Sequence, residues 1–266
     1  MQFDFLAHRP KAVIGMVHLG ALPGTALHDS DGGMAKLIDA ALADIAALQA
    51  GGVDALMFGN ENDRPYSLKA PPAGIAAMAA IIAAVKPALN IPFGVNYLWD
   101  PTASIAIAAA TGASFVREIF TGVYASDMGV WAPDAGEALR TRRSLGAERV
   151  KLCFNINAEF ATPLDTRPIG LRAKSAVFSS LADAIMVSGP LTGQPADRSE
   201  LRQVRDAVTE VPIFVNTGVN LDNVADMLAL ADGCVVGTHF KQGGITWNAV
   251  DAARVKRFMD RVAGLR

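Results

Sequence analysis

Eight short apolar runs alternate with eight longer helical stretches along the 266 residues of the chain. The long stretches carry apolar residues at three- and four-residue spacing, which is typical of amphipathic helices, and the short runs have the length of buried strands. We expect strands at 12–19, 53–60, 91–98, 114–122, 149–157, 183–189, 211–216 and 233–240. We expect helices at 34–52, 73–88, 101–113, 133–147, 168–181, 197–210, 220–230 and 248–264. Gly51 and Gly52 mark one helix end, and Pro101 marks a first turn.

This alternation predicts a (β/α)8 barrel, an α/β fold, that occupies residues 1–266 as a single domain. No linker or low-complexity segment interrupts it. A hydrophobic content of 51% with 19% charged residues fits a chain with a large buried core. An open, doubly wound sheet is the alternative, but it does not require eight evenly spaced units, and no GxGxxG motif follows the first strand.

The sequence favours a cytoplasmic protein that does not insert into a membrane. A net charge of −2 gives no reason to expect a nucleic-acid partner, and the two cysteines, Cys153 and Cys234, have no metal or redox spacing. The first eleven residues lack the apolar core of a signal peptide, and the most apolar segment, 76–90, is too short to span a bilayer. Peripheral membrane association remains open. We expect a homo-oligomer.

The loops after the seventh and eighth strands predict a phosphate site. In (β/α)8 barrels these two loops commonly hold a phosphate, and glycine lets the backbone N–H groups approach an anion closely. The alternative is that these glycines only close tight turns. The candidate phosphate-binding residues here are Asn216, Thr217, Gly218, Gly237, Thr238 and Lys241.

Polar residues at the other strand ends are candidates for the chemistry, since barrel active sites lie at the carboxyl ends of the strands. Asn60, Asn96 and Ser188 are further candidates for substrate binding, and His18, Asp63, Lys151 and Glu118 for proton transfer.

Several of these roles have a structural alternative. Lys151 shares its parity with Cys153 and Asn155, so it is expected in the barrel lumen, either as a base or nucleophile or in an ion pair with Glu118 or Asp63. His18 could be a core donor, and alternation lets only one of Arg117 and Glu118 face the lumen. No cofactor is expected.

A divalent metal is not excluded. The candidate ligands are His18, Glu61, Asp63 and His239, and no motif such as HExxH fixes them.

Five long motifs resemble the BtpA/SgcQ family over residues 11–262. They are "GMVHLGALPG", "NENDRPY", "FTGVYASDMGVW", "VSGPLTGQPAD" and "ADGCVVGTHFKQGGITWNAVDAARVKRFM". The resemblance implies a barrel of the ribulose-phosphate-binding type. One member is a photosystem I biogenesis factor, and others are encoded with sugar-metabolism genes, but no settled reaction comes with the family.

The positions that match family motifs are His18, Asn60, Asp63, Lys151, Gly218, Gly237 and Lys241. The chain departs from relatives at Gly59, where many carry an acid, and in strand 149–157, where relatives often keep a histidine beside the lysine.

Two functions follow as expectations. The first is an enzyme of the aldolase, isomerase or epimerase type that acts on a sugar- or nucleoside-derived phosphate, with the phosphate at the last two loops. The second is a non-catalytic assembly or stability factor for a photosynthetic or other membrane complex. A lysine in the lumen and hydrogen-bond donors at nearly every strand end favour the enzyme.

Overall fold

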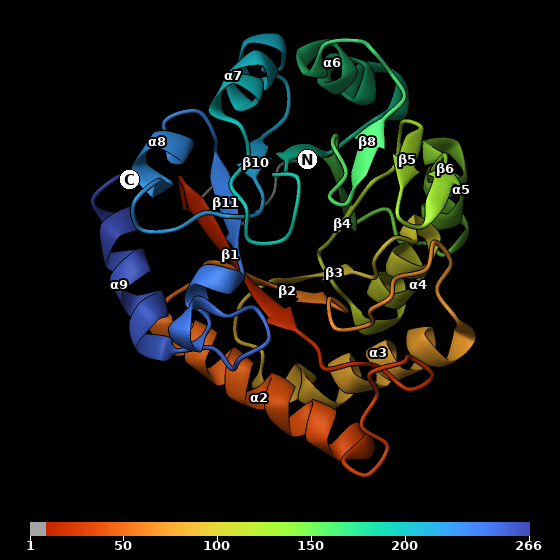
Figure 1. Cartoon of the computed structure of the whole chain (residues 1–266), viewed down its shortest axis with the longest axis vertical. Helices are drawn as coiled ribbons and strands as arrows, with labels where there is room; N and C mark the ends of the chain where they lie inside the picture. Colours follow the sequence, from red (N-terminus) through yellow and green to blue (C-terminus); the bar gives the residue numbers. More distant parts are fainter. Residues whose placement is uncertain (1–8) are drawn as a thin grey trace.

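The computed structural model describes residues 9–266, and its centre is a closed barrel of eight parallel strands. Each barrel strand pairs with the next one along the chain, and the last strand pairs with the first, as in Figure 1. The (β/α)8 prediction is confirmed, because an open sheet would leave two unpaired edges. The barrel strands are β1 (Ala12–His18), β2 (Ala55–Gly59), β3 (Phe93–Asn96), β4 (Phe115–Glu118), β7 (Lys151–Asn155), β9 (Ala184–Val187), β10 (Ile213–Val215) and β11 (Gly233–Val236).

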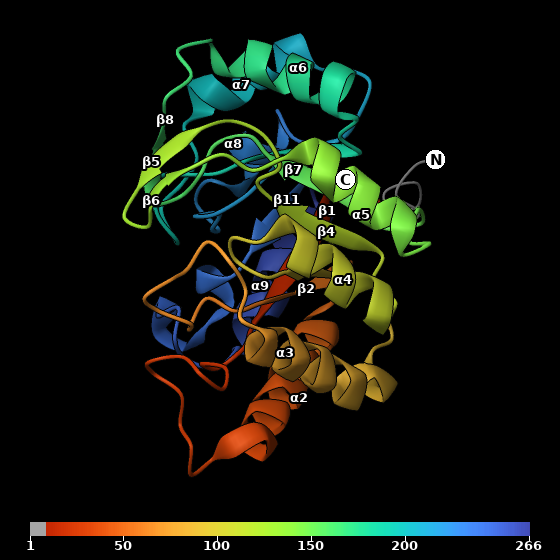
Figure 2. The same cartoon turned by 90° about the vertical axis from the view of Figure 1, so that its right-hand side faces the viewer.

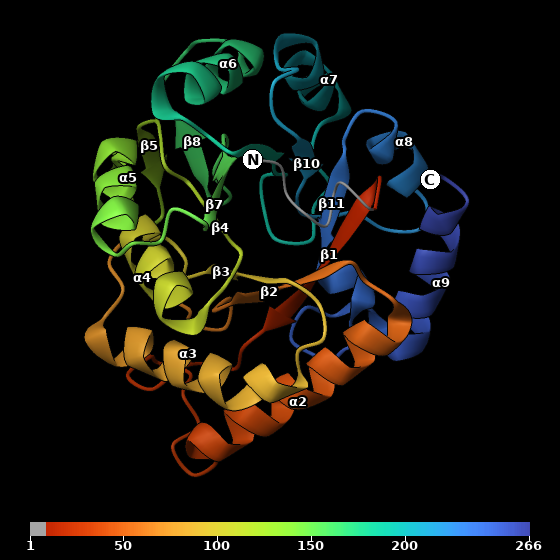
Figure 3. The ribbon, with the colours of Figure 1, turned by 180° about the vertical axis from the view of Figure 1, so that it is seen from behind.

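The helices form a ring around these strands, which Figures 1 and 3 show from opposite sides. The helix after β2 is followed by a short 3-10 turn, η1 (Lys86–Ala88), and two more, η2 (Thr238–Phe240) and η3 (Gln242–Gly244), follow β11. Within residues 9–266, no helix is both long and apolar enough to cross a membrane. The α-helices are α2 (Gly33–Gly51), α3 (Pro72–Val85), α4 (Pro101–Thr111), α5 (Ala135–Ser144), α6 (Ile169–Ser180), α7 (Arg198–Ala207), α8 (Val224–Leu228) and α9 (Ala252–Ala263).

Local sequence signals fix several helix ends as expected. Gly52 follows α2 in the left-handed conformation, with φ +87°, and its N–H bonds back to the last turn. Pro101 occupies the first turn of α4, and the side chain of Asp100 accepts a hydrogen bond from the Ala103 N–H.

The strands are buried on both faces, which explains why they read as continuous apolar runs. One parity fills the barrel interior, as with Met16, Phe115 and Cys153. The other parity packs against the helices, as with Val17 and Val116. The side chains that continue the interior parity at the carboxyl ends of the strands therefore face the mouth of the barrel.

A second, three-stranded antiparallel sheet was not predicted. It consists of β5 (Tyr124–Ser126), β6 (Gly129–Trp131) and β8 (Ala161–Pro163), from the loops that follow β4 and β7. Figure 2 shows these strands together at one end of the barrel. An aromatic cluster that includes Trp99, Tyr124 and Trp131 packs there as a separate small core, which gives this end of the molecule a stable wall.

Candidate functional site

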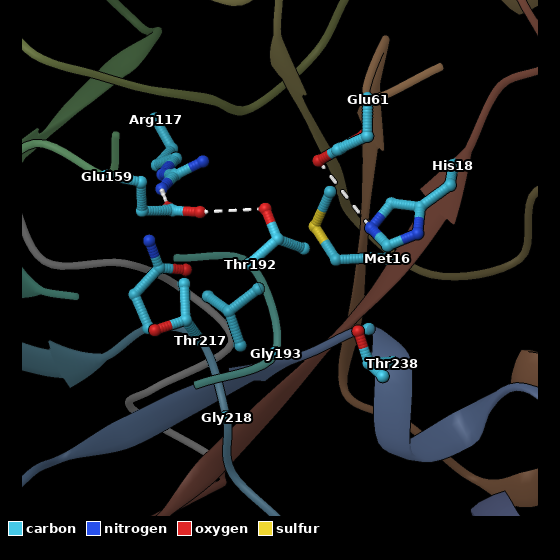
Figure 4. A pocket seen from close by; sticks show the side chains of 13 residues that line it. Met16, His18, Glu61, Arg117, Glu159, Thr192, Gly193, Thr217, Gly218 and Thr238 are labelled. Carbon is cyan, nitrogen blue, oxygen red and sulfur yellow. Dashed lines mark hydrogen bonds and ion pairs between the residues drawn. The ribbon is translucent and has the colours of Figure 1, made fainter. Parts of the chain in front are cut away.

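The carboxyl ends of the strands enclose a small polar cavity, which we call the inner cavity. Its volume is about 40 Å³, enough for a few water molecules or a few substrate atoms. Figure 4 shows how its side chains converge from opposite sides of the barrel. Its lining residues are Met16, His18, Glu61, Arg117, Glu159, Thr192, Gly193, Asn216, Thr217, Gly218, Val235, Gly237 and Thr238.

His18 and Glu61 form a close pair on one side of the inner cavity. The imidazole Nε2 lies 3.5 Å from Glu61 Oε1, and both side chains are buried. Glycines make room for the pair: a Cβ on Gly59 would lie 2.5 Å from Glu61 Oε2, and one on Gly237 would lie 2.8 Å from His18 Cε1. Glu61 therefore folds back over Gly59, and its carboxyl group occupies the space that a side chain at position 59 would need.

Burial sets the protonation of this pair. It raises the pKa of Glu61 to about 7, because an ionised carboxylate loses its hydration. Burial, followed by the positive charge of Lys241, lowers the pKa of His18 to about 3. At neutral pH the imidazole is therefore neutral, whereas the carboxyl group can take up or release a proton. A carboxyl group with a pKa near 7 suits general acid–base catalysis.

Two polar atoms of the pair are left for other partners. His18 Nδ1 and Glu61 Oε2 are buried and have no hydrogen-bond partner within residues 9–266. Such atoms are costly in a folded core and call for an explanation. Both residues line the inner cavity, so a ligand that enters it lies next to this pair.

A buried ion pair lies on the other side of the inner cavity. Arg117 Nη2 is 2.6 Å from Glu159 Oε1, and each side chain is only 6% exposed. Arg117 Nη1 also donates to Asn96 Oδ1 at 2.8 Å, and Thr192 Oγ1 donates to Glu159 Oε2 at 3.0 Å. With its amide oxygen turned toward the guanidinium, Asn216 accepts from Arg117 Nη2 at 2.5 Å and from Nε at 3.0 Å. The guanidinium is held rigidly, and its charge is compensated.

A larger pocket adjoins the inner cavity, and we call it the outer pocket. Its volume is about 230 Å³, and its wall contains several residues without side chains, so that the backbone lines it directly. It shares Gly193, Gly218, Gly237 and Thr238 with the inner cavity. Its full lining is Gly193, Gly218, Val219, Asn220, Gly237, Thr238, His239, Gly244 and Arg254.

Arg254 supplies the positive charge of the outer pocket. Its Nε donates to the His239 carbonyl at 2.7 Å, and no carboxylate of the described chain lies within ion-pair distance of it. It stands in the first turn of α9, where the helix dipole disfavours a cation. An arginine in that position, half-buried and without an ion pair, is suited to an anionic ligand.

The loop after β9 closes over both cavities and is fixed by the loop after β10. Thr217 Oγ1 accepts from the Gly189 N–H at 2.7 Å and donates to the Gln194 carbonyl at 2.8 Å. A Cβ on Gly218 would lie 2.2 Å from the Pro195 nitrogen, so only glycine allows this close approach of the two loops. The Thr217 hydroxyl, expected at a phosphate, instead joins the loops.

Two lysines predicted at the site lie away from it. Lys241 is 1% exposed, and its Nζ pairs with Asp44 Oδ2 on α2 at 2.6 Å, so it is not free for a phosphate. Lys151 begins β7, at the opposite end of the barrel, and its Nζ lies 3.2 Å from Asp183 Oδ1. The expected pairing of Lys151 with Glu118 or Asp63 is wrong, because Glu118 ends β4 and Asp63 lies in the loop after β2, both at the other end of the barrel.

Glu118 and Asp63 lie near the site but line neither cavity. Glu118 Oε1 accepts from Asn96 Nδ2 at 2.6 Å, and burial raises its pKa to about 8. Alternation places Arg117, not Glu118, in the lumen. Asp63 accepts from the Leu22 N–H and from Asn60 Nδ2, and thereby ties the loops after β1 and β2 together.

Of the remaining predicted residues, some hold the loops and strand ends in place and others line the inner cavity. Asn60 also accepts from the Leu98 N–H, and Ser188 Oγ bonds to Asn155 and Asn216 beneath the inner cavity. His18, Asn216, Thr217, Gly218, Gly237 and Thr238 line the inner cavity. Within residues 9–266, no three His, Cys, Asp or Glu side chains converge in a way that could hold a metal ion.

Sequence reasoning missed part of the site. Glu61 was expected only as a polar residue at a strand end and as a possible metal ligand, and Arg117 only as the alternative to Glu118. Glu159, Thr192 and Arg254 were not singled out. The position of Arg254 directly after the helix cap Asp251, against the helix dipole, is a signal that could have identified it.

The fold and the site place this protein in the class of (β/α)8 barrels that gather ionisable side chains at the carboxyl ends of their strands. The sequence profile of the BtpA family matches residues 9–264, and the chain belongs to this family. It is 50% identical over 256 residues to the putative sgc region protein SgcQ of Escherichia coli (strain K12), with 96% of each chain covered.

Two more distant comparisons agree. The chain is 33% identical to the photosystem I biogenesis protein BtpA of Synechocystis sp. (strain ATCC 27184 / PCC 6803 / Kazusa), covering 97% of this chain and 90% of that one. Among solved structures, the native structure of KDPGal superposes with a TM-score of 0.59 at 15% identity, covering 100% of this chain and 98% of the other. This last likeness concerns the fold alone.

Proposed function

We propose that this protein is an enzyme that moves a proton next to the carbonyl group of a small phosphorylated metabolite. The outer pocket binds the phosphate, and the inner cavity holds the reacting carbons. Glu61 takes up and returns the proton, while neutral His18 polarises the carbonyl oxygen or donates to it. This is the chemistry of an isomerase or epimerase on a sugar phosphate.

One observation carries this proposal. A pocket with an arginine free of ion pairs shares a wall of glycine backbone with a cavity that holds a carboxyl group whose pKa is about 7. The first arrangement suits a phosphate and the second suits a proton transfer, and they are adjacent. A non-catalytic assembly factor has no need for a buried carboxyl group that titrates near neutral pH.

The lysines of the described chain narrow the type of reaction. A Schiff-base aldolase needs a lysine beside the substrate carbonyl. None of the residues that line the two cavities is a lysine, since Lys151 pairs with Asp183 and Lys241 pairs with Asp44. The side chains that are present support enolisation by a carboxylate instead.

Two measurements test the proposal. Inorganic phosphate should raise the melting temperature of the wild type and of Arg261→Gln, a control on the exposed surface of α9, but not of Arg254→Gln. In D2O, a panel of ketose and aldose monophosphates should include one whose proton next to the carbonyl exchanges with solvent in the presence of the wild type and not of Glu61→Gln, as followed by NMR. Equal phosphate protection of both arginine variants, or exchange unchanged by Glu61→Gln, would refute the assignment.

A further inference from the structure

The two cavities differ in charge, so the two ends of a ligand that spans them meet different surroundings. The inner cavity contains one permanent cation, Arg117, and it is paired with Glu159 at 2.6 Å. The same guanidinium also donates to Asn96 and Asn216, so its hydrogen bonds are directed within the protein. The charge of this arginine is therefore balanced by a carboxylate of the protein itself.

The other groups of the inner cavity are neutral or acidic. His18 is held neutral by burial, and Glu61 and Glu159 are both carboxyl groups. Thr192 Oγ1 donates to Glu159 at 3.0 Å. This set offers acceptors and small donors, which are the partners that ligand hydroxyl groups need.

The cation without a carboxylate partner lies in the outer pocket. Among the described residues, the Arg254 guanidinium bonds only to His239, through Nε to its carbonyl at 2.7 Å and through Nη2 to Nδ1 at 3.5 Å. Arg64, in the loop after β2, stacks over the Trp247 ring at 3.7 Å and lines neither cavity. A ligand that spans both cavities therefore meets a free positive charge at one end only.

We infer that the ligand is a monophosphate ester whose other end is an uncharged, polyhydroxylated carbon chain, and that Glu159 excludes ligands with a second negative charge. A carboxylate or second phosphate in the inner cavity would lose its hydration beside two carboxyl groups without gaining a cation. Hydroxyl groups would instead replace their hydration with hydrogen bonds. This inference rests on the proposed function and specifies the substrate class of the same site.

Binding of matched ligands by calorimetry tests the inference. The probes are a six-carbon ketose 6-phosphate, the corresponding 6-phospho-aldonic acid and the 1,6-bisphosphate. The wild type should bind the ketose monophosphate at least tenfold more tightly than either doubly charged ligand. In Glu159→Gln, Arg117 loses its carboxylate, so the phospho-acid should gain at least tenfold relative to the ketose monophosphate. Glu148→Gln, at an exposed glutamate, should keep the wild-type order.

The outcomes separate the two proposals. If the wild type binds the phospho-acid or the bisphosphate as tightly as the ketose monophosphate, and Arg254→Gln still abolishes binding, the charge inference is wrong while the phosphate site stands. If none of the three ligands binds, and inorganic phosphate protects the wild type and Arg254→Gln equally, both proposals fail. If Glu159→Gln does not fold, the order of the three ligand affinities measured on the wild type decides the inference alone.

Discussion

Replacing Lys241 with methionine should destabilise the fold and leave phosphate binding intact. The Lys241 ammonium is 2.6 Å from Asp44 Oδ2, and the two side chains are 1% and 8% exposed. Asp44 Oδ1 also accepts from the Val250 N–H, so the pair attaches the segment after η3 to α2. Methionine fills a similar volume but leaves the Asp44 charge buried without its partner. Loss of one member of a buried pair costs about 3–5 kcal/mol.

The shift in melting temperature follows from the size of the chain. At about 2.1 cal/mol/K per residue, a chain of 266 residues has an unfolding entropy of about 0.56 kcal/mol/K. A loss of 3–5 kcal/mol therefore lowers the melting temperature by about 5–9 °C. Calorimetry or tryptophan fluorescence during heating measures this shift. The double variant Asp44→Asn/Lys241→Met should recover most of it, because no charge is left buried and the asparagine oxygen can still accept from Val250.

Two results would refute this reasoning. One is a melting temperature within about 2 °C of the wild type, which would mean that the pair is not buried in solution. The other is a stable Lys241→Met protein that phosphate no longer protects, which would return Lys241 to the ligand and remove the distinction drawn between Lys241 and Arg254.

Two further predictions concern pH. The exchange rate of the substrate proton should rise with pH up to a midpoint near 7 and then level, because proton abstraction needs the ionised form of Glu61, and Glu61→Gln should lower the rate by about 10²–10⁴-fold and remove this midpoint. A rate that is independent of pH between 5 and 9 would exclude Glu61 as the base. The pKa of Glu118 is about 8 in the folded protein, against an ordinary value of 4.5, so the folded protein binds the Glu118 proton more tightly than the unfolded chain does. This difference stabilises the fold at low pH, and the stabilisation is lost as the pH rises from 4.5 through 8. Glu118→Gln should therefore gain stability relative to the wild type between pH 5 and pH 9 in denaturant titrations, and a constant difference would contradict the buried, neutral carboxyl group.

Periodicity was sufficient to predict the barrel because each strand is buried on both faces and each helix on one. The same alternation placed His18, Gly218 and Gly237 at the mouth, since His18 ends a strand and the two glycines lie in the loops after the last two strands. It could not predict β5, β6 and β8, which are three residues each and are held by a small aromatic cluster rather than by a sequence pattern.

The errors at the site arise from contacts that sequence periodicity does not determine. The alternation of residues along a strand predicts which face of the sheet a side chain points to, but it does not predict how close that residue is to either end of the barrel. Lys151 is the first residue of β7, so it lies at the end opposite the site. Lys241 follows a 3-10 turn, where no periodicity applies, and its partner Asp44 lies 197 positions earlier in the chain. Glu61 reaches the cavity only because Gly59 leaves space beneath it, a contact that depends on three-dimensional packing.

A crystal structure of the protein soaked with inorganic phosphate tests the central claim most directly. The account predicts the anion in the outer pocket, within hydrogen-bond distance of the Arg254 guanidinium and of the backbone around Gly218 and Gly237. It also predicts that the anion is absent from crystals of Arg254→Gln soaked in the same way. Phosphate bound elsewhere on the protein, or bound in the outer pocket of both crystals alike, would contradict it.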